Sequence, residues 1–221
     1  MTDAAAHANP TEALLLDRAL TLFAQKGYAA TSVREIIEAA QVTRPVLYYY
    51  CDSKEGLFLR IVETALRDAY LGLGAVLTQH ATCADRLRAI IRGSFAFCAR
   101  DPRVPRLMFQ VFSGPQTDRA AAIVAHLTAL RFGVVVQTMA DGLRRGEIQG
   151  GDAESLALAF CCLMDQHINV LSQLPEPEKR LTPELADALV DLLLYGAGSG
   201  ERKPFRLPAF AGGNSHPGES S

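Results

Sequence analysis

The segment from Thr43 to Tyr50 places a guanidinium, a proline ring and three phenols within eight residues. A guanidinium such as that of Arg44 can form paired hydrogen bonds with guanine O6 and N7, or it can grip a phosphate. Tyrosine hydroxyls commonly bond phosphate oxygens. Three of the six tyrosines in the chain stand here in one run, and Lys54 follows at a predicted helix start. These side chains indicate recognition of a polyanion.

The same eight residues have the features of a very short helix. Thr43 is its expected N-cap, and Pro45 falls in the first turn, where a missing backbone N–H costs nothing. When Leu47 faces inward to anchor the helix, Arg44, Pro45 and Tyr48 share the solvent side. The spacing therefore predicts that the guanidinium and a phenol are displayed together.

Helices before this segment must support it, because it is too short to be stable alone. Apolar spacing predicts one helix that ends at Gly27 and a second that begins at Ser32, where Ser32 and Glu35 form a capping box. Two helices joined by a tight turn, with the second exposing such side chains, are typical of a helix-turn-helix, whose second helix enters the DNA major groove. The pattern alone leaves open an ordinary three-helix corner with surface tyrosines.

Composition limits the alternatives. The 221 residues are 49% hydrophobic and carry a net charge of -2, which predicts a packed protein and argues against a sequence-blind, charge-driven nucleic-acid binder. The odd number of cysteines, five, without a Cys-x-x-Cys pair favours reduced thiols. The start of the chain does not resemble a signal peptide, and the longest apolar run, 156–164, is short for a membrane span. We therefore expect a cytoplasmic protein without a membrane partner.

The remainder of the chain is helical by its apolar spacing, so the fold is predicted to be all-α. The expected domain organisation is a flexible N-terminus at 1–10, a helix-turn-helix DNA-binding domain at 11–58, a helical ligand-binding and dimerisation domain at 59–197, and a flexible tail at 198–221. A long helix is expected to begin at the Asp52–Glu55 cap and to extend as far as Leu77.

Residues 13–59 resemble the DNA-binding domain of the tetracycline-repressor (TetR) family of bacterial transcription regulators. Four pieces keep the family's order and spacing, and they are ALTLFAQKGY at 19–28, TSVREI at 31–36, VTRPVLYYY at 42–50 and SKEGL at 53–57. Two positions depart from the family pattern. Gln41 stands in a turn where the family usually has Gly, and Cys51 replaces a usual Phe. We expect both to affect stability more than DNA contacts.

The resemblance implies roles for individual residues. It places Arg44, Pro45, Val46 and Tyr48 at the bases or the groove floor, and Val33 near the neighbouring bases. It assigns phosphate contacts to Ser32, Tyr49, Tyr50 and Lys54. Tyr50 is ambiguous, because it shares the side of Leu47 on the helical wheel and its ring could belong to the core.

The resemblance also implies a homodimer that binds a palindromic operator in double-stranded DNA, acts as a repressor and is released by a small, largely apolar effector. Candidates for the dimer seam are Ala157, Cys161, Ile168, Leu185, Leu189 and Leu192. Candidates for the effector pocket are Phe95, Met108, Phe109, Phe112, Phe132, Met139, Met164 and His167. For each of these apolar residues, a place in an ordinary core is the alternative. His167 and Asp165 are either hydrogen-bonded at the seam or a polar handle for a ligand.

Other classes of function have weaker support. The chain has no Gly-x-Ser-x-Gly, the five histidines are isolated, and His80 with Cys83 lacks a partner pair, so we expect neither an enzyme nor a metal site, and no cofactor. A helical protein-interaction module or a small-molecule-binding protein without DNA function remains the alternative. Such a module would still have to explain Arg44, the tyrosine run and Lys54 together.

Overall fold

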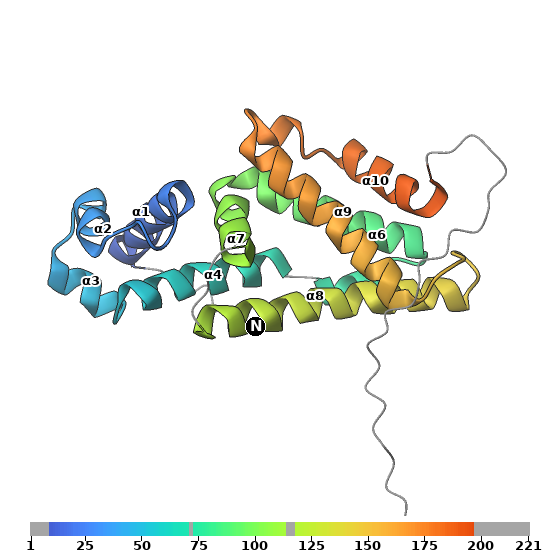
Figure 1. Ribbon diagram of the computed structural model, residues 1–221, viewed down its shortest axis with the longest axis horizontal. Helices are drawn as coiled ribbons and strands as arrows, with labels where there is room; N and C mark the ends of the chain where they lie inside the picture. Colours follow the sequence, from blue (N-terminus) through green and yellow to red (C-terminus); the bar gives the residue numbers. More distant parts are fainter. Residues whose placement is uncertain (1–8, 71–72, 114–117, 197–221) are drawn as a thin grey trace, which may run out of the picture.

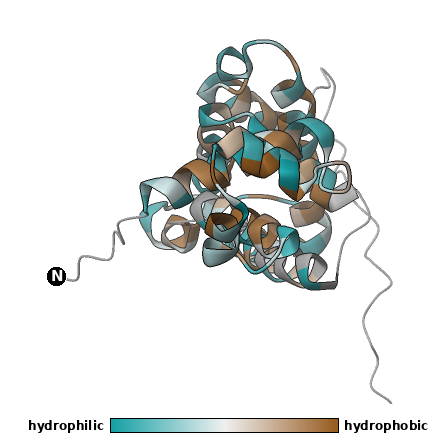
Figure 2. Cartoon of the chain, turned by 90° about the vertical axis from the view of Figure 1, so that its left-hand side faces the viewer, coloured by the Kyte–Doolittle hydropathy of each residue, from teal (hydrophilic) through white to brown (hydrophobic). Residues whose placement is uncertain are grey.

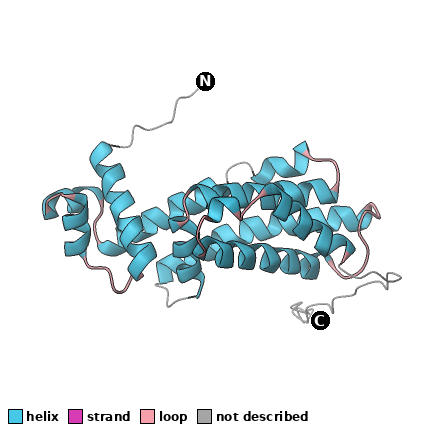
Figure 3. Cartoon of the chain, turned by 90° about the horizontal axis from the view of Figure 1, so that it is seen from above, coloured by secondary structure: helices cyan, strands magenta, loops and turns pink. Residues whose placement is uncertain are grey.

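The computed structural model describes residues 9–70, 73–113 and 118–196, and these residues form helices joined by loops, with no strand among them (Figures 1 and 3). The all-α prediction is confirmed. The helices are α1 (Pro10–Lys26), α2 (Val33–Ala40), α3 (Arg44–Tyr50), α4 (Lys54–Tyr70), α5 (Val76–Gln79), α6 (Cys83–Arg100), α7 (Arg103–Ser113), α8 (Asp118–Arg144), α9 (Ala153–Gln173) and α10 (Pro183–Tyr195), with short 3-10 turns η1 (Leu73–Ala75) and η2 (Pro177–Lys179). The predicted tail and residues 1–8 lie outside the described residues.

Helices α1 to α3 form a compact head at one end of the molecule (Figure 1). Each begins or ends where its local chemistry dictates. Gly27 ends α1 with φ 85°, and Ser32 and Glu35 form the predicted capping box of α2. Asn9, expected in a flexible N-terminus, caps α1 by accepting a hydrogen bond from Thr11 N at 3.0 Å. Thr43 occupies the N-cap of α3, but its side chain makes no capping hydrogen bond, which differs from the prediction.

Gln41 ends α2 in the left-handed conformation, with φ 54° and ψ 38°. A side chain with a Cβ costs about 1 kcal/mol there, because Cβ approaches the following carbonyl oxygen. We expect Gln41→Gly to raise the free energy of unfolding by about 0.5–1 kcal/mol, since the larger backbone entropy of glycine offsets part of the gain. Urea unfolding measures the difference. Gln41→Ala, which keeps the Cβ, should give no gain, and equal values for the two variants would contradict the strain.

Helix α4 leaves the head as a long connector and ends at Tyr70, earlier than the predicted Leu77. The sequence that follows contains Gly72 and Gly74, and glycine in a helix interior is unfavourable by roughly 0.5–1 kcal/mol relative to alanine. The chain continues through η1 and α5 instead. Arg86 at the start of α6 secures this stretch by donating hydrogen bonds to the backbone oxygens of Leu77 and His80 and by pairing with Asp141 at 2.8 Å.

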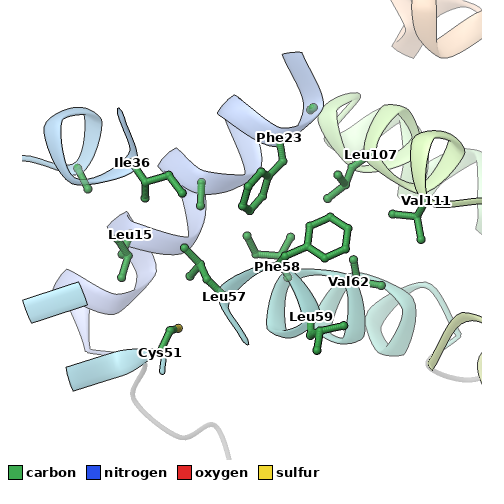
Figure 4. Close-up of a cluster of buried hydrophobic side chains, with 14 of the residues drawn as sticks. Leu15, Phe23, Ile36, Cys51, Leu57, Phe58, Leu59, Val62, Leu107 and Val111 are labelled. Atoms are coloured by element: carbon green, nitrogen blue, oxygen red, sulfur yellow. The ribbon is translucent and has the colours of Figure 1, made fainter. Parts of the chain in front are cut away.

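The buried side chains form two clusters. One belongs to the regulatory bundle of α6, α8, α9 and α10, and the other fills the head. The helices are amphipathic, as the alternation of apolar and polar stretches in Figure 2 shows. Helix α7 lies between the two bodies, and its residues Leu107, Met108 and Val111 belong to the head cluster. Figure 4 shows Leu107 and Val111 facing Phe23 and Phe58. The core of the head is therefore completed by a helix that follows α4, α5 and α6 in the chain.

Candidate nucleic-acid interface

Helix α3 presents one face to solvent and anchors the other. Leu47 is fully buried, whereas Arg44, Pro45, Tyr48 and Tyr49 are exposed, with Tyr49 at 82%. The guanidinium carbon of Arg44 lies 5.6 Å from the centre of the Tyr48 ring. A cation over an aromatic face is attracted by the ring quadrupole, which orients the guanidinium before any ligand arrives. As predicted, Arg44 and Tyr48 lie on the same solvent-exposed side of α3.

Val46, Tyr50 and Val33 differ from these exposed residues because each is half-buried. Tyr50 and Val33 pack against the head cluster, and the Tyr50 ring meets the Tyr49 ring edge-on at 5.0 Å. The ring of Tyr50 therefore serves the core in part, as its position on the helical wheel suggested. The DNA contacts expected of these three residues stay predictions.

The hydroxyl of Ser32 is occupied within the chain. Its Oγ accepts a hydrogen bond from Glu35 N at 3.2 Å and donates one to Glu35 Oε2 at 2.9 Å. Glu35 in turn accepts a hydrogen bond from the Lys26 ammonium at 2.6 Å. A phosphate approaching Ser32 therefore meets a carboxylate beside the hydroxyl. The expected phosphate contact of Ser32 requires this small network to rearrange.

Glu35 provides a pH-dependent contribution to stability. The hydrogen bond from Lys26, followed by those from Ser32, lowers the pKa of the Glu35 carboxyl from 4.5 to about 2. A depressed folded-state pKa stabilises the fold above the unfolded value and loses that effect as the pH falls toward the folded value. We expect Glu35→Gln to lower the free energy of unfolding at pH 6 and the difference from wild type to close between about pH 4.5 and pH 2. Urea unfolding across this range measures it, and a constant gap would contradict the assignment.

Lys54 is also engaged within the head. Its ammonium donates hydrogen bonds to Tyr28 O at 3.0 Å and Thr31 O at 2.9 Å, and it lies 4.3 Å from the centre of the Tyr28 ring. Lys54 thereby joins the start of α4 to the loop before α2. Its expected phosphate contact stays a prediction, and the structure adds a positioning role that the motif did not indicate.

We expect Lys54→Met to lower the free energy of unfolding by about 1–3 kcal/mol, because Tyr28 O and Thr31 O each lose the hydrogen bond from the ammonium while the apolar stem is kept. Lys26→Met is the matched control. It removes an exposed ion pair with Glu35 and should cost less than about 1 kcal/mol. Urea unfolding of both variants measures the two losses in free energy of unfolding, and equal losses would contradict the positioning role of Lys54.

Four of the eight candidate effector residues gather in the regulatory core, whereas Met108 and Phe109 lie elsewhere. Phe95, Met139 and Met164 are buried in the regulatory core, with Phe132 packed against it, whereas Met108 belongs to the head cluster. Phe109 is 40% exposed on α7, and the side chain of Phe112 lies outside the described residues. A surface hollow of about 390 Å³ has charged walls and contains none of these candidates; it is lined by His80, Asp85, Arg88, Ala89, Arg92, Asp187 and Asp191. No group of metal-ligating side chains occurs among the described residues.

Both polar groups expected on α9 have partners within the chain. Asp165 accepts two hydrogen bonds from the buried Arg131, at 2.5 and 2.6 Å, and His167 Nδ1 lies 2.7 Å from Leu163 O. The side chain of Asp165 is nevertheless 48% exposed. The simpler of the two interpretations, a satisfied hydrogen bond, accounts for each residue.

Half of the residues predicted for the dimer seam face the core of the chain itself. Ala157, Cys161 and Leu189 are buried, and Ile168 and Leu185 are half-buried, so three of the six candidates are inaccessible to a second copy. Leu192, at 43% exposure, is the candidate that faces outward. The large apolar residues that sequence reasoning missed are exposed on α9 and α10 or at their ends, and they are Leu158, Val170, Leu174 and Tyr195. Inward and outward apolar positions are adjacent on these helices, which is why spacing could not separate them.

Helix α9 is long and apolar enough, by length and composition, to cross a membrane. Core helices of soluble proteins have the same composition, and α9 packs against α6, α7, α8 and α10. A membrane role is therefore weakly supported.

The fold and the surface of α3 define a helix-turn-helix protein with a helical domain behind its head. A family model described as bacterial regulatory proteins, tetR family, matches residues 15–61. The transcriptional activator FasR of Mycolicibacterium smegmatis is 32% identical over 96 residues, which are 43% of this chain and 44% of the relative. The chain spans less than half the length of the curated relatives it matches first.

Solved structures agree over more of the chain. FadR from Bacillus subtilis, in complex with stearoyl-CoA, superposes with a TM-score of 0.70 at 18% identity, covering 84% of this chain and 99% of that one. AibR, in complex with isovaleryl coenzyme A and operator DNA, superposes with a TM-score of 0.68 at 22% identity, covering 83% and 98%. Residues 15–61 therefore match the DNA-binding domain of bacterial regulatory proteins of the tetR family, and the described chain as a whole has the fold of these solved regulators.

Proposed function

We propose that this protein is a cytoplasmic transcriptional repressor that binds a palindromic operator as a homodimer and is released by a small, largely apolar effector. The observation that carries the proposal is the exposed face of α3. Arg44, Tyr48 and Tyr49 lie on this face, while Leu47 on the opposite side is buried and fixes the helix in place. A helix with this face, presented by a compact head, has the dimensions and chemistry that major-groove recognition requires.

The exposed apolar side chains of α9 and α10 support the proposed dimerisation. Leu158, Val170, Leu192 and Tyr195 are between 37% and 49% exposed. Apolar side chains repeated on two neighbouring helices favour an isologous contact with a second copy, in which the same faces meet across a twofold axis. The two heads of such a dimer would each bind one half-site of a palindromic operator.

The regulatory bundle is the part of the chain that we propose binds the effector. FadR and AibR were solved with acyl-CoA molecules, and their similar fold supports a molecule with an apolar acyl chain as the first effector class to test. Release requires that the effector bind a conformer with a different head spacing more tightly than the DNA-bound one. About 5.5 kcal/mol of differential affinity is sufficient for a complete switch.

In vitro selection from a random duplex library tests the function directly, because it needs no operator sequence as a starting point. We expect enrichment of a palindromic sequence, two protomers per duplex by light scattering, and release on addition of stearoyl-CoA or isovaleryl-CoA. A folded dimer that enriches no sequence would contradict the DNA function and favour the protein-interaction module. Enrichment without release would contradict the effector class alone. A reporter gene behind the enriched sequence distinguishes repression from activation.

A further inference from the structure

Among the described residues, four buried side-chain polar atoms have no hydrogen-bond partner, and three of them lie on two neighbouring helices. The exception, Glu12 Oε1 in the head, is held in an ion pair with Arg60. The other three atoms are Thr128 Oγ1 and Arg131 Nε on α8 and Ser172 Oγ on α9. Buried polar atoms normally have partners, because leaving one unpaired costs free energy. Their concentration on α8 and α9 therefore indicates a place that supplies hydrogen bonds to a ligand.

The three atoms lie on one side of an ion pair that joins α8 to α9. The two helices are connected by residues 145–152 and run in opposite directions (Figure 1). Arg131 donates to both carboxylate oxygens of Asp165, at 2.5 and 2.6 Å. Thr128 precedes Arg131 by about one turn, and Ser172 follows Asp165 by about two turns. Because the helices are antiparallel, both hydroxyls are displaced from the ion pair in the same direction.

The charge of Arg131 is balanced within the chain. Its side chain is 10% exposed, and Asp165 is the carboxylate with which it pairs. The electrostatic influence of the guanidinium also reaches Tyr70, Cys98 and Cys161. Burial raises the pKa of Cys98 to about 12, that of Cys161 to about 11 and that of Tyr70 above its usual value, so these three groups are neutral at pH 7. A second anion at Arg131 would therefore meet the repulsion of Asp165.

A neutral acceptor suits the unpartnered donors on α8. Arg131 Nε–H supplies one hydrogen bond, and the Thr128 hydroxyl can supply a second. A carbonyl oxygen accepts both through its two lone pairs and brings no charge into the interior. Ser172 lies about 10 Å further along α9 than Asp165, too far to share the same oxygen. Between them Ile168 packs against the regulatory core, so the group that carries the carbonyl meets apolar surface.

We propose that α8 and α9 form the polar end of the effector site, where Arg131 and Thr128 bind the neutral carbonyl oxygen of an acyl ester, thioester or amide. An ionised free acid is then the weaker ligand. This inference rests on the proposed regulation by an effector and names the head-group chemistry of that effector.

Calorimetric titration of the full chain without DNA tests the head group independently of the DNA function. The probes are isovaleryl-CoA and decanoyl-CoA, the methyl esters of the two acids, and the free acids themselves. For at least one acyl group we expect the methyl ester and the thioester to bind, and the ester to bind about 10-fold more tightly than the free acid at pH 7. A free acid that binds as tightly as its ester, or a lack of binding by every probe, would overturn the inference.

Thr128→Val removes the unpartnered hydroxyl at nearly constant volume. We expect this variant to have a higher Tm, because no hydrogen bond of the free protein is lost, and to bind the methyl ester about 3- to 10-fold more weakly. Thr138→Val is the matched control on the same helix, because Thr138 Oγ1 already donates to Val134 O at 2.9 Å. Its affinity for the ester should equal that of wild type. A Thr128→Val variant with wild-type affinity would overturn the contact, whatever its Tm.

Asp165→Asn removes the balancing charge while keeping an oxygen for Arg131. The free acid should then gain about 10- to 100-fold in affinity relative to the ester, because its carboxylate meets an uncompensated guanidinium. Arg131→Lys keeps the charge but lacks the Nε–H group, and its affinity for the ester should fall about 10-fold. An unchanged preference in Asp165→Asn would overturn the charge balance on which the proposal depends.

Selection from the random duplex library separates this inference from the proposed function. An enriched operator together with a lack of ester binding would overturn the carbonyl site alone. Ester binding that Thr128→Val weakens, without any enriched duplex, would support the carbonyl site and contradict the DNA function.

Discussion

Replacing Arg44 with alanine should lower the affinity for the enriched duplex by about 10- to 100-fold for each half-site, because a bidentate guanine contact is worth about 1–3 kcal/mol. Both heads lose the contact in a homodimer, so the losses multiply. The affinity for random DNA should fall much less, since that binding does not depend on the paired hydrogen bonds between Arg44 and guanine. The substitution leaves the fold intact, because Arg44 is exposed at the first position of α3 and alanine is a good helix former.

Two further variants separate geometry from charge. Arg44→Lys keeps the positive charge but loses the planar fork, so its loss on the enriched duplex should approach that of alanine. Arg34→Ala removes another exposed cation, one that is paired with Glu38, and any loss of affinity should be similar on the enriched and the random duplex. Fluorescence anisotropy with both duplexes gives the affinities of wild type and all three variants. Equal losses for Arg44→Ala on enriched and random DNA would contradict a role in reading bases.

The local features of the head could be predicted because their causes are local. A capping box needs only Ser32 and Glu35 at their spacing, and the orientation of Arg44 and Tyr48 follows from Leu47 and the 3.6-residue period. Gln41 in the left-handed region was also readable, because the resemblance marks that position as a turn. Each of these inferences uses residues no more than a few positions apart.

The contacts that could not be predicted join distant parts of the chain. Lys54 reaches carbonyl oxygens 23 and 26 residues earlier, and nothing in its own motif distinguishes this use from phosphate binding. The apolar candidates on α6 to α9 have the right spacing, but spacing does not assign Met108 to the head core and Met164 to the regulatory core. The same limit applies to the dimer-seam candidates that are buried within the chain. The spacing of apolar residues on a helix does not show which neighbouring helix, or which second copy, a face packs against.

Helix α7 connects the head to the regulatory bundle more directly than its sequence suggests. Arg103 donates to Thr21 Oγ1 at 2.7 Å and pairs with Asp17 at 2.8 Å, both on α1. Gln110 donates to Ala24 O at 3.2 Å. On the other side, Arg106 donates to Ser172 O on α9 at 3.2 Å. A displacement of α9 therefore has a hydrogen-bonded route to α1 through α7, beside the covalent route through α4.

Leu107 is the apolar centre of this connection, and Leu107→Ala should lower the free energy of unfolding by about 2–5 kcal/mol. The side chain is 1% exposed and belongs to the same cluster as Phe23 of α1 and Phe58 and Val62 of α4 (Figure 4). Truncation leaves a cavity between α7 and the head, so the loss should concentrate there. Amide hydrogen exchange should speed up along α1 more than along α10.

Leu130→Ala is the matched control for this prediction, because it makes the same truncation on α8 at a side chain that is 53% exposed. It should change the free energy of unfolding by less than about 0.5 kcal/mol and leave exchange along α1 unaltered. If Leu107→Ala accelerated exchange along α1 and α10 equally, the head would unfold only together with the regulatory bundle, and α7 would not be a separable joint. If exchange along α1 stayed at the wild-type rate, Leu107 would contribute nothing to the docking of the head.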